Sequence, residues 1–275
     1  MNKLLTVFIA LQVFAFSAVG QSIVNAGSTG GCIPVRSLSE DSLAFAAGER
    51  LKFTMHYEWG TLDSDVGWAT VGIDTVRFNG QKAFHCSAYG RTTKLYDFFF
   101  KVREDFQSWF TVDGLVPLKF TRNTNEGKYE ARNVYSYMWD AADSSSIAAD
   151  VYTTTSGHRY VAMPLDKCTF DLPALFFFAR NMDFSKVEPN VKYPMTFAID
   201  DDIYNVYFIL RGREVKKVKG FGTVITGDED LSVWISDDEN RIPVLFEAPI
   251  LVGVASGRLD SYSGLKHPFS SLVRN

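Results

Sequence analysis

The chain has 275 residues, of which 46% are hydrophobic and 22% are charged, a balance typical of folded globular proteins and too apolar for intrinsic disorder. Its 28 basic and 32 acidic side chains give a net charge of -4, which excludes the strongly basic surface with which proteins bind nucleic acids. The 5 Trp, 12 Tyr and 23 Phe residues favour strands and predict a β-rich core.

The first twenty residues have the pattern of a bacterial export signal. One cation, Lys3, precedes an apolar run over residues 4–16, and small residues lead up to Gly20. The pattern predicts a periplasmic protein that is cleaved after Gly20 (residues 1–20) and keeps no stable membrane span once the leader is removed. A lipid anchor would need a cysteine directly after the cleavage site, whereas the nearest one is Cys32.

Residues 21–44 are rich in Gly, Ser and Thr and show no apolar period, which predicts a flexible N-terminal segment. Residues 45–275 are expected to form a single β-rich domain. Its first expected strand, residues 51–59, alternates apolar and polar side chains with a period of two. One face of that strand is therefore expected to be buried and the other to face water.

Further strand-like segments follow at short intervals, separated by hairpin-type turns such as Asn79-Gly80 and Asp113-Gly114. They cover residues 67–78, 83–92, 103–111, 115–122, 128–139, 147–155, 159–163, 192–199, 203–212, 214–219, 230–235, 244–250 and 252–262.

A single helix is expected over residues 172–182, because Asp171 is a good N-cap residue, Pro173 suits a first helical turn and no glycine interrupts the segment. The remaining segments show no βαβ rhythm. The fold class predicted from this order is mainly β: a strongly curved antiparallel sheet that forms an open or a closed barrel, with one helix near 172–182.

Three cysteines in an exported chain cannot all pair with one another. Cys86 lies in a strand-like segment, Cys168 precedes the expected helix, and Cys32 follows the leader. If one pair forms, Cys86 with Cys168 is the expected one. The alternative is three isolated thiols, with the two internal ones buried as small apolar side chains.

Motifs of nucleophilic catalysis or nucleotide binding are absent from the sequence, so no catalytic residue is predicted. His56 and Glu58 share one face of a strand but lack a third metal ligand. The acidic runs 200–202, 228–230 and 237–239 do not have the ligand spacing of a calcium loop and are typical of turns. No metal and no cofactor are therefore expected.

Two dense aromatic runs, residues 96–100 and 176–178, place successive rings on both faces of their elements. Either these rings fill a solid core, or some of them line an apolar cavity that holds a lipid-like molecule. For the second alternative, the expected ligand-binding residues are Tyr57, Trp59, Trp109 and Phe177.

Several segments combine into a recognisable pattern: FAAGERL at 45–51, residues 67–71, PLKF at 117–120, EGKY at 126–129 and WISDDENRIPV at 234–244. Together they resemble DUF3108, a family of exported bacterial proteins whose function is unknown. The resemblance implies a Gram-negative envelope protein of Bacteroidetes style and transfers no catalytic residue. A weaker, fold-level likeness is to periplasmic lipoprotein carriers of the LolA type.

From these observations we expect a non-enzymatic periplasmic protein that binds or carries an apolar or lipid-like ligand or another envelope component. The alternative from a different class is a structural or assembly protein that holds an envelope protein through exposed sheet edges.

Overall fold

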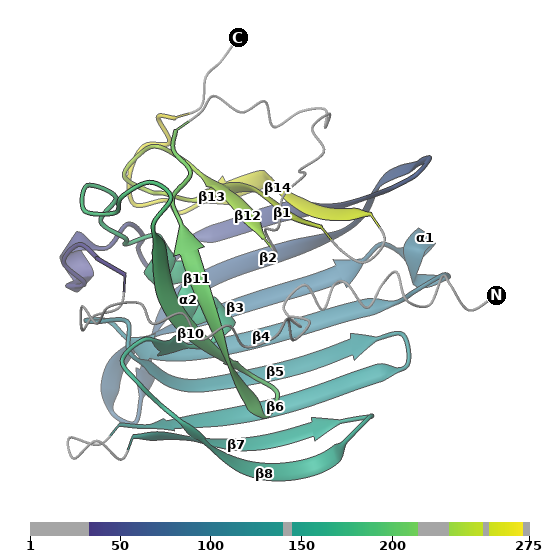
Figure 1. The fold of residues 1–275 in the computed structure, drawn as a ribbon, viewed down its shortest axis with the longest axis horizontal. Coiled ribbons are helices and arrows are strands. Elements are labelled where there is room, and N and C mark those ends of the chain that lie inside the picture. Colours follow the sequence, from purple (N-terminus) through teal and green to yellow (C-terminus); the bar gives the residue numbers. More distant parts are fainter. Residues whose placement is uncertain (1–32, 140–144, 214–230, 250–252, 272–275) are drawn as a thin grey trace.

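The computed structural model describes residues 33–139, 145–213, 231–249 and 253–271, which form an antiparallel sheet of 11 strands and a second sheet of three (Figure 1). Across the large sheet, the order is β12 (Ser232–Ile235), β13 (Pro243–Pro249), β14 (Val254–Ser263), β1 (Arg50–Trp59), β2 (Leu62–Phe78), β3 (Gln81–Thr92), β4 (Val102–Thr111), β5 (Pro117–Glu126), β6 (Tyr129–Met138), β7 (Ser146–Thr153) and β8 (Gly157–Pro164).

The small sheet and the helices complete the fold. The small sheet has the order β11 (Asp202–Ile209), β10 (Lys192–Ile199) and β9 (Thr169–Phe170). The helices are α1 (Lys94–Asp97), α2 (Leu172–Ala179) and a 3-10 turn at Glu40–Ser42. Figure 1 shows α2 and the small sheet on the same face of the large sheet, which we call the covered face; the opposite face is the open face.

The mainly β, antiparallel prediction is confirmed, but no barrel forms among the described residues. β12 and β8 lie at opposite ends of the strand order and do not pair with each other. Because α2 and the small sheet cover the apolar face, its side chains are buried without closure of the sheet. The strand expected at 214–219 lies outside the described residues.

Local sequence signals explain the regular part of the sheet. In β1, Leu51 and Phe53 are buried on the covered face, whereas Lys52 alternates onto the open face. The two-residue turn between β2 and β3 has Asn79 at φ 49° and Gly80 at φ 82°, the left-handed conformation that such tight hairpins require.

Helix α2 begins where the sequence predicts and ends three residues earlier. The Asp171 side chain accepts a hydrogen bond from the Ala174 amide at 2.9 Å and so caps the helix. Phe177 is 1% exposed and packs against Phe45 and Phe110, with ring centroids 4.6 and 6.0 Å away. The helix therefore fills the core of the covered face with its aromatic side chains.

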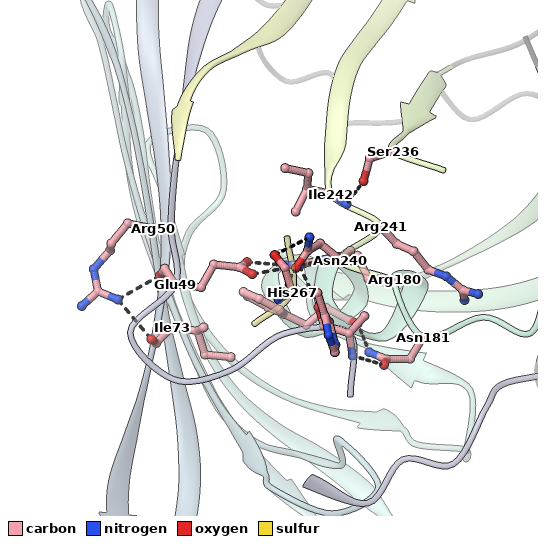
Figure 2. A network of polar contacts seen from close by, with 12 residues as sticks. Glu49, Arg50, Ile73, Arg180, Asn181, Ser236, Asn240, Arg241, Ile242 and His267 are labelled. Atoms are coloured by element: carbon pink, nitrogen blue, oxygen red, sulfur yellow. Dashed lines mark hydrogen bonds and ion pairs between the residues drawn. The ribbon is translucent and has the colours of Figure 1, made fainter. Parts of the chain in front are cut away.

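A buried ion pair joins distant segments beside this core (Figure 2). Arg180 and Glu49 form a bidentate pair at 2.5 and 2.9 Å, and each side chain is 1% exposed. The same guanidinium donates to the Asn240 carbonyl, and the Asn240 side chain bonds in turn to the backbone of His267. Two segments of the family pattern, FAAGERL and WISDDENRIPV, thus meet at Arg180, which ties the end of α2 to both.

The N-terminal segment and the cysteines differ from expectation. The expected leader, residues 1–20, lies outside the described residues, and the flexible segment 21–44 is described from residue 33. Ile33 and Leu43 are already buried there, so ordered structure begins before Phe45.

Cys86 is a buried free thiol, whereas Cys168 is disulfide-bonded. The expected Cys86–Cys168 pair and the alternative of three free thiols are therefore both wrong. Cys86 lies in β3 among the core residues under α2, where its side chain serves as a small apolar group. The third cysteine, Cys32, lies outside the described residues.

Candidate functional site

The open face of the large sheet carries a continuous row of polar and aromatic side chains. The backbone pairing places one residue from each of six neighbouring strands in line, and the row reads Lys52, Thr70, Tyr89, Asp105, Asn123 and Arg132. Because side chains on one face repeat every second residue, parallel rows flank this one on both sides. The open face is thus a broad polar platform with aromatic rings set into it.

Two grooves cross this platform and meet at one residue. The first has a volume of about 360 Å³, and its side-chain walls include Trp68, Tyr89, Arg91, Arg103, Asp105 and Asn123. The second has a volume of about 480 Å³, and its walls include Arg50, Lys52, Thr70, Ser87, Tyr89 and Tyr262. Tyr89 lines both grooves and is 44% exposed. Both volumes lie within the range of small-molecule sites, and their junction makes the site elongated.

One amide fixes the ring at the junction. Gln107 donates hydrogen bonds to the Tyr89 hydroxyl at 2.9 Å and to Asp105 Oδ1 at 2.5 Å. Its oxygen accepts a hydrogen bond from His85 Nε2 at 2.8 Å, so that nitrogen carries the hydrogen. Tyr89 and Asp105 are therefore held in place before any ligand arrives, which lowers the entropic cost of binding.

The cations of the grooves are largely neutralised by acids beside them. Lys52 pairs with Asp260 at 2.7 Å. Arg103 binds Asp97 through both of its terminal nitrogens, and this hydrogen bonding holds the pKa of Asp97 well below its usual range. In the first groove Arg91 lies over the Trp68 ring, 5.7 Å from its centroid.

Arg50 is paired in the same way, and a glycine makes room for it. Arg50 binds both oxygens of Asp74, at 2.9 and 2.7 Å. A Cβ atom on Gly72 would lie 2.8 Å from Arg50 Cδ, so the glycine allows the arginine to lie over β2 and reach Asp74 in the same strand. The grooves therefore offer many hydrogen-bonding groups but little unbalanced charge.

The four side chains that the sequence nominated for ligand binding are not brought together. Phe177 lies in the core of the covered face, and Tyr57 is buried against Val66. Trp59 is 44% exposed at the end of β1. Trp109 lies on the open face, stacked on His85 with centroids 4.6 Å apart, and is outside the described walls of both grooves. Their binding role stays a prediction, whereas the groove residues follow from strand register, which the sequence reasoning did not use.

A second polar cluster lies on the covered face and contains two buried carboxyl groups, Glu104 and Glu126. Glu104 accepts a hydrogen bond from Thr124 at 2.6 Å, and its other oxygen meets no conventional donor among the described residues. Burial raises the pKa of Glu126 to about 9, and the neighbouring Glu104 carboxylate adds to the rise. Burial also raises the pKa of Glu104. The two groups therefore share a proton at neutral pH.

Arg122 and Asp200 complete this cluster, but the positive charge of Arg122 does not offset the raised pKa values of the two glutamates. Arg122 donates to Thr124 at 2.8 Å and to Asp200 at 2.8 Å, so its charge is directed mainly to Asp200. Glu104 and its neighbour Asp105 point to opposite faces, as expected for adjacent strand residues. The side chains of the acid pair therefore point to the covered face, although Glu104 is also among the residues that line the first groove.

The register of the β4–β5 hairpin brings the two acids together. Glu104 pairs with Thr124 and Val102 pairs with Glu126, so the two glutamates are diagonal neighbours on one face. The Asp113-Gly114 turn was recognisable in the sequence, but counting back from it would have missed this pair, because the β4–β5 register shifts between Trp109 and Phe110.

The described part of the chain offers neither a cluster of metal ligands nor a membrane-spanning helix. There, no group of three or more His, Cys, Asp or Glu side chains could hold a metal ion. The buried His56 lies between Asp63 and Asp65, at 2.9 Å from each, rather than beside Glu58. None of the described helices is both long and apolar enough to span a membrane.

Comparison with known proteins gives one match. The family model described as "Protein of unknown function (DUF3108)" matches residues 52–260. The chain belongs to this family. The match begins in β1 and ends in β14, so it spans both sheets, Tyr89 and Arg180. The chain matches no curated protein and no solved structure.

Proposed function

We propose that this DUF3108 protein is a periplasmic, non-enzymatic binding protein that holds an extended, neutral, polar component of the cell envelope on its open face. The chemical class that fits best is a neutral oligosaccharide. The observation that carries the proposal is the meeting of two grooves, of about 360 and 480 Å³, at the exposed ring of Tyr89. The sequence led us to expect either an apolar ligand or another envelope component. We propose the envelope component, because the grooves are lined mainly by polar side chains.

The chemistry of the groove walls supports an uncharged polyhydroxyl ligand. A sugar ring has an apolar C–H face that stacks on an aromatic ring and a rim of hydroxyl groups that need donors and acceptors. Trp68 and Tyr89 supply rings, and Asn123 and Ser87 supply hydrogen-bonding groups. Since the groove cations are largely paired, an anionic ligand would have to displace existing ion pairs.

The position of the acid pair supports a binding role over a hydrolytic one. Glycoside hydrolysis uses two carboxyl groups that flank the scissile bond. Glu104 and Glu126 are close together but point to the covered face. Two acids, Glu104 and Asp105, line the first groove, and of these adjacent strand residues Asp105 is the one that points to the open face. Export to the periplasm rests on the leader pattern of residues 1–20 and on the family resemblance.

Isothermal titration calorimetry with a panel of neutral hexasaccharides built from glucose, mannose, galactose or N-acetylglucosamine tests the proposal. We expect at least one of them to bind, and Tyr89→Ala to weaken its affinity at least tenfold, or about 1.4 kcal/mol. The matched control is Tyr160→Ala, an exposed tyrosine of β8 outside both grooves. Failure of every hexasaccharide to bind, or equal losses in the two variants, would contradict the proposal.

The alternative function is assembly through a sheet edge, and the edge strand β8 favours it. Among the described residues, β8 extends over eight residues and pairs along only one side, with β7. An unpaired edge can accept a strand from a partner protein. Because proline cannot donate a backbone hydrogen bond, Tyr160→Pro would then abolish capture of an envelope protein while hexasaccharide binding stays intact.

A further inference from the structure

An apolar tip projects from one end of the large sheet, at the connection between β3 and β4. Leu95, Phe98 and Phe99 are 69%, 87% and 71% exposed. The two phenylalanine rings lie edge to face, with centroids 5.4 Å apart. Large apolar side chains with such exposure are unfavourable in water and mark an interaction site when they cluster.

Hydrogen bonds and side-chain packing hold the loop that carries the tip in place. Asp97 binds both terminal nitrogens of Arg103 and accepts a hydrogen bond from Thr92 at 2.6 Å. Tyr96 turns inward and packs on the cluster of Tyr57 and Val66. The inward residues therefore anchor the loop, while Leu95, Phe98 and Phe99 are left to the solvent.

A second contact holds the other side of the loop. Phe100 packs so closely over Gly127 that a Cβ atom there would lie 2.9 Å from its ring. The Gly127 amide also donates to the Lys101 carbonyl at 2.8 Å. The tip is thus tied to the β5–β6 turn as well as to the β1–β2 hairpin.

Unpaired positive charge surrounds the apolar tip. Lys94 and Lys101 flank it in sequence, and Lys128 lies in the adjoining β5–β6 turn; all three are exposed. Within the described ranges, none of these lysines has an acidic partner at ion-pair distance. The acid of the loop, Asp97, is already bound by Arg103. The loop at 94–101 is therefore net positive, although the whole chain carries a net charge of -4 and the neighbouring β1–β2 hairpin carries the exposed acids Glu58 and Asp63.

We propose that this tip docks on the surface of an anionic lipid bilayer, with Phe98 and Phe99 inserted at the headgroup level. Aromatic rings are favoured at that depth, and clustered lysines are attracted to anionic headgroups. Three side chains on a convex loop present far less area than a stable protein interface needs. The neighbouring β1–β2 hairpin ends at the same end of the sheet and adds the exposed Trp59 and Leu62.

Vesicle flotation tests this proposal with purified protein, wild type and variants all in the same processed form. The vesicles are phosphatidylcholine alone or phosphatidylcholine with 30% phosphatidylglycerol. We expect binding to the anionic vesicles that weakens as salt rises. Phe98→Ser with Phe99→Ser should lower the partition coefficient at least tenfold. A triple variant that combines Lys94→Gln, Lys101→Gln and Lys128→Gln should lose the preference for vesicles that contain phosphatidylglycerol.

Tyr160→Ser is the matched control, since it removes an exposed ring on β8 far along the strand order from the tip. It should bind vesicles as the wild type does. The replaced side chains are exposed, and unchanged melting temperatures establish that the variants are folded. The proposal is overturned if wild-type protein does not float, if the double serine variant floats equally well, or if the control loses as much. It is also overturned if sedimentation shows a dimer that the double serine variant abolishes, because the tip then docks on a second copy.

Discussion

Glu49 and Arg50 are neighbours in the chain, yet their side chains leave the sheet on opposite faces (Figure 2). Glu49 points to the covered face and pairs with Arg180, where each side chain is 1% exposed. Arg50 points to the open face and pairs with Asp74, where about half of each side chain is exposed. The geometry of the two pairs is alike, and their surroundings differ.

The difference in solvent exposure assigns the two faces different tasks. An exposed ion pair is surrounded by water that replaces it at little cost, whereas a buried charge that loses its partner stays desolvated. The covered face should therefore govern folding, and the open face can exchange partners with little effect on stability. Substitutions on each face test this contrast.

The largest expected effect follows from breaking the buried pair. Arg180→Met should lower the free energy of unfolding by about 3–5 kcal/mol, because it leaves the Glu49 carboxylate buried without a cation. The Asn240 carbonyl also loses its donors. Urea denaturation measures the change. Combining Arg180→Met with Glu49→Leu should recover part of the loss, and a double variant less stable than the single one would contradict this account.

The acid pair on the covered face should make stability depend on pH. The pKa of Glu126 is about 9 in the folded chain and 4.5 when unperturbed, so the folded state binds more protons between these values. Its stabilising contribution is complete below pH 4.5 and is lost as pH rises through about 9, with a slope approaching about 1.4 kcal/mol per pH unit. Glu126→Gln should therefore flatten the fall in stability between pH 7 and 9.

Stability is compared above pH 7 because a second buried acid, Asp171, loses most of its own pH-dependent contribution below that pH. Burial raises the pKa of Asp171 from 3.8 to about 7, so most of its contribution is lost before that point. Glu130→Gln, in the neighbouring strand β6, is the control and should keep the wild-type slope. Parallel stability curves for Glu126→Gln and the wild type would show that the acid pair does not share a proton.

The smallest expected effect is on the open face. Arg50→Met removes an ion pair that resembles the buried one in its distances, yet it should cost less than about 1 kcal/mol. The urea denaturation midpoint of Arg50→Met is compared with that of Arg180→Met. Equal losses in the two variants would remove the distinction between the faces.

Local order was predictable from sequence because it depends on neighbouring residues. The alternation in the first half of β1, the Asn79-Gly80 turn and the Asp171 cap are each decided within a few positions, and each was predicted. The alternation fails beyond Met55, where a register shift leaves His56 buried and Trp59 exposed. The contacts that close the structure are long-range. Glu49 and Arg180 are 131 residues apart, and no periodicity links them.

The grooves could not be predicted for a related reason. Their walls come from strands β14 and β1–β5, so they depend on the register of every pair in between. The aromatic run around Phe177 correctly indicated a face that must be covered, whereas the same expectation for residues 96–100 was wrong, because Phe98 and Phe99 are 87% and 71% exposed. It could not show whether that cover is solid, which follows only from how Phe45 and Phe110 meet the helix.

The central claim, that the covered face supports the fold and the open face binds, is tested most directly by measuring Tyr89→Ala and Phe177→Ala side by side. Each variant is assayed for its free energy of unfolding and for its affinity toward the hexasaccharide that binds best. Tyr89→Ala should lose affinity at least tenfold with little change in stability, whereas Phe177→Ala should lose about 3–5 kcal/mol of stability and keep its affinity while folded. Loss of affinity in folded Phe177→Ala, with Tyr89→Ala unaffected, would contradict the account and move the binding site to the covered face.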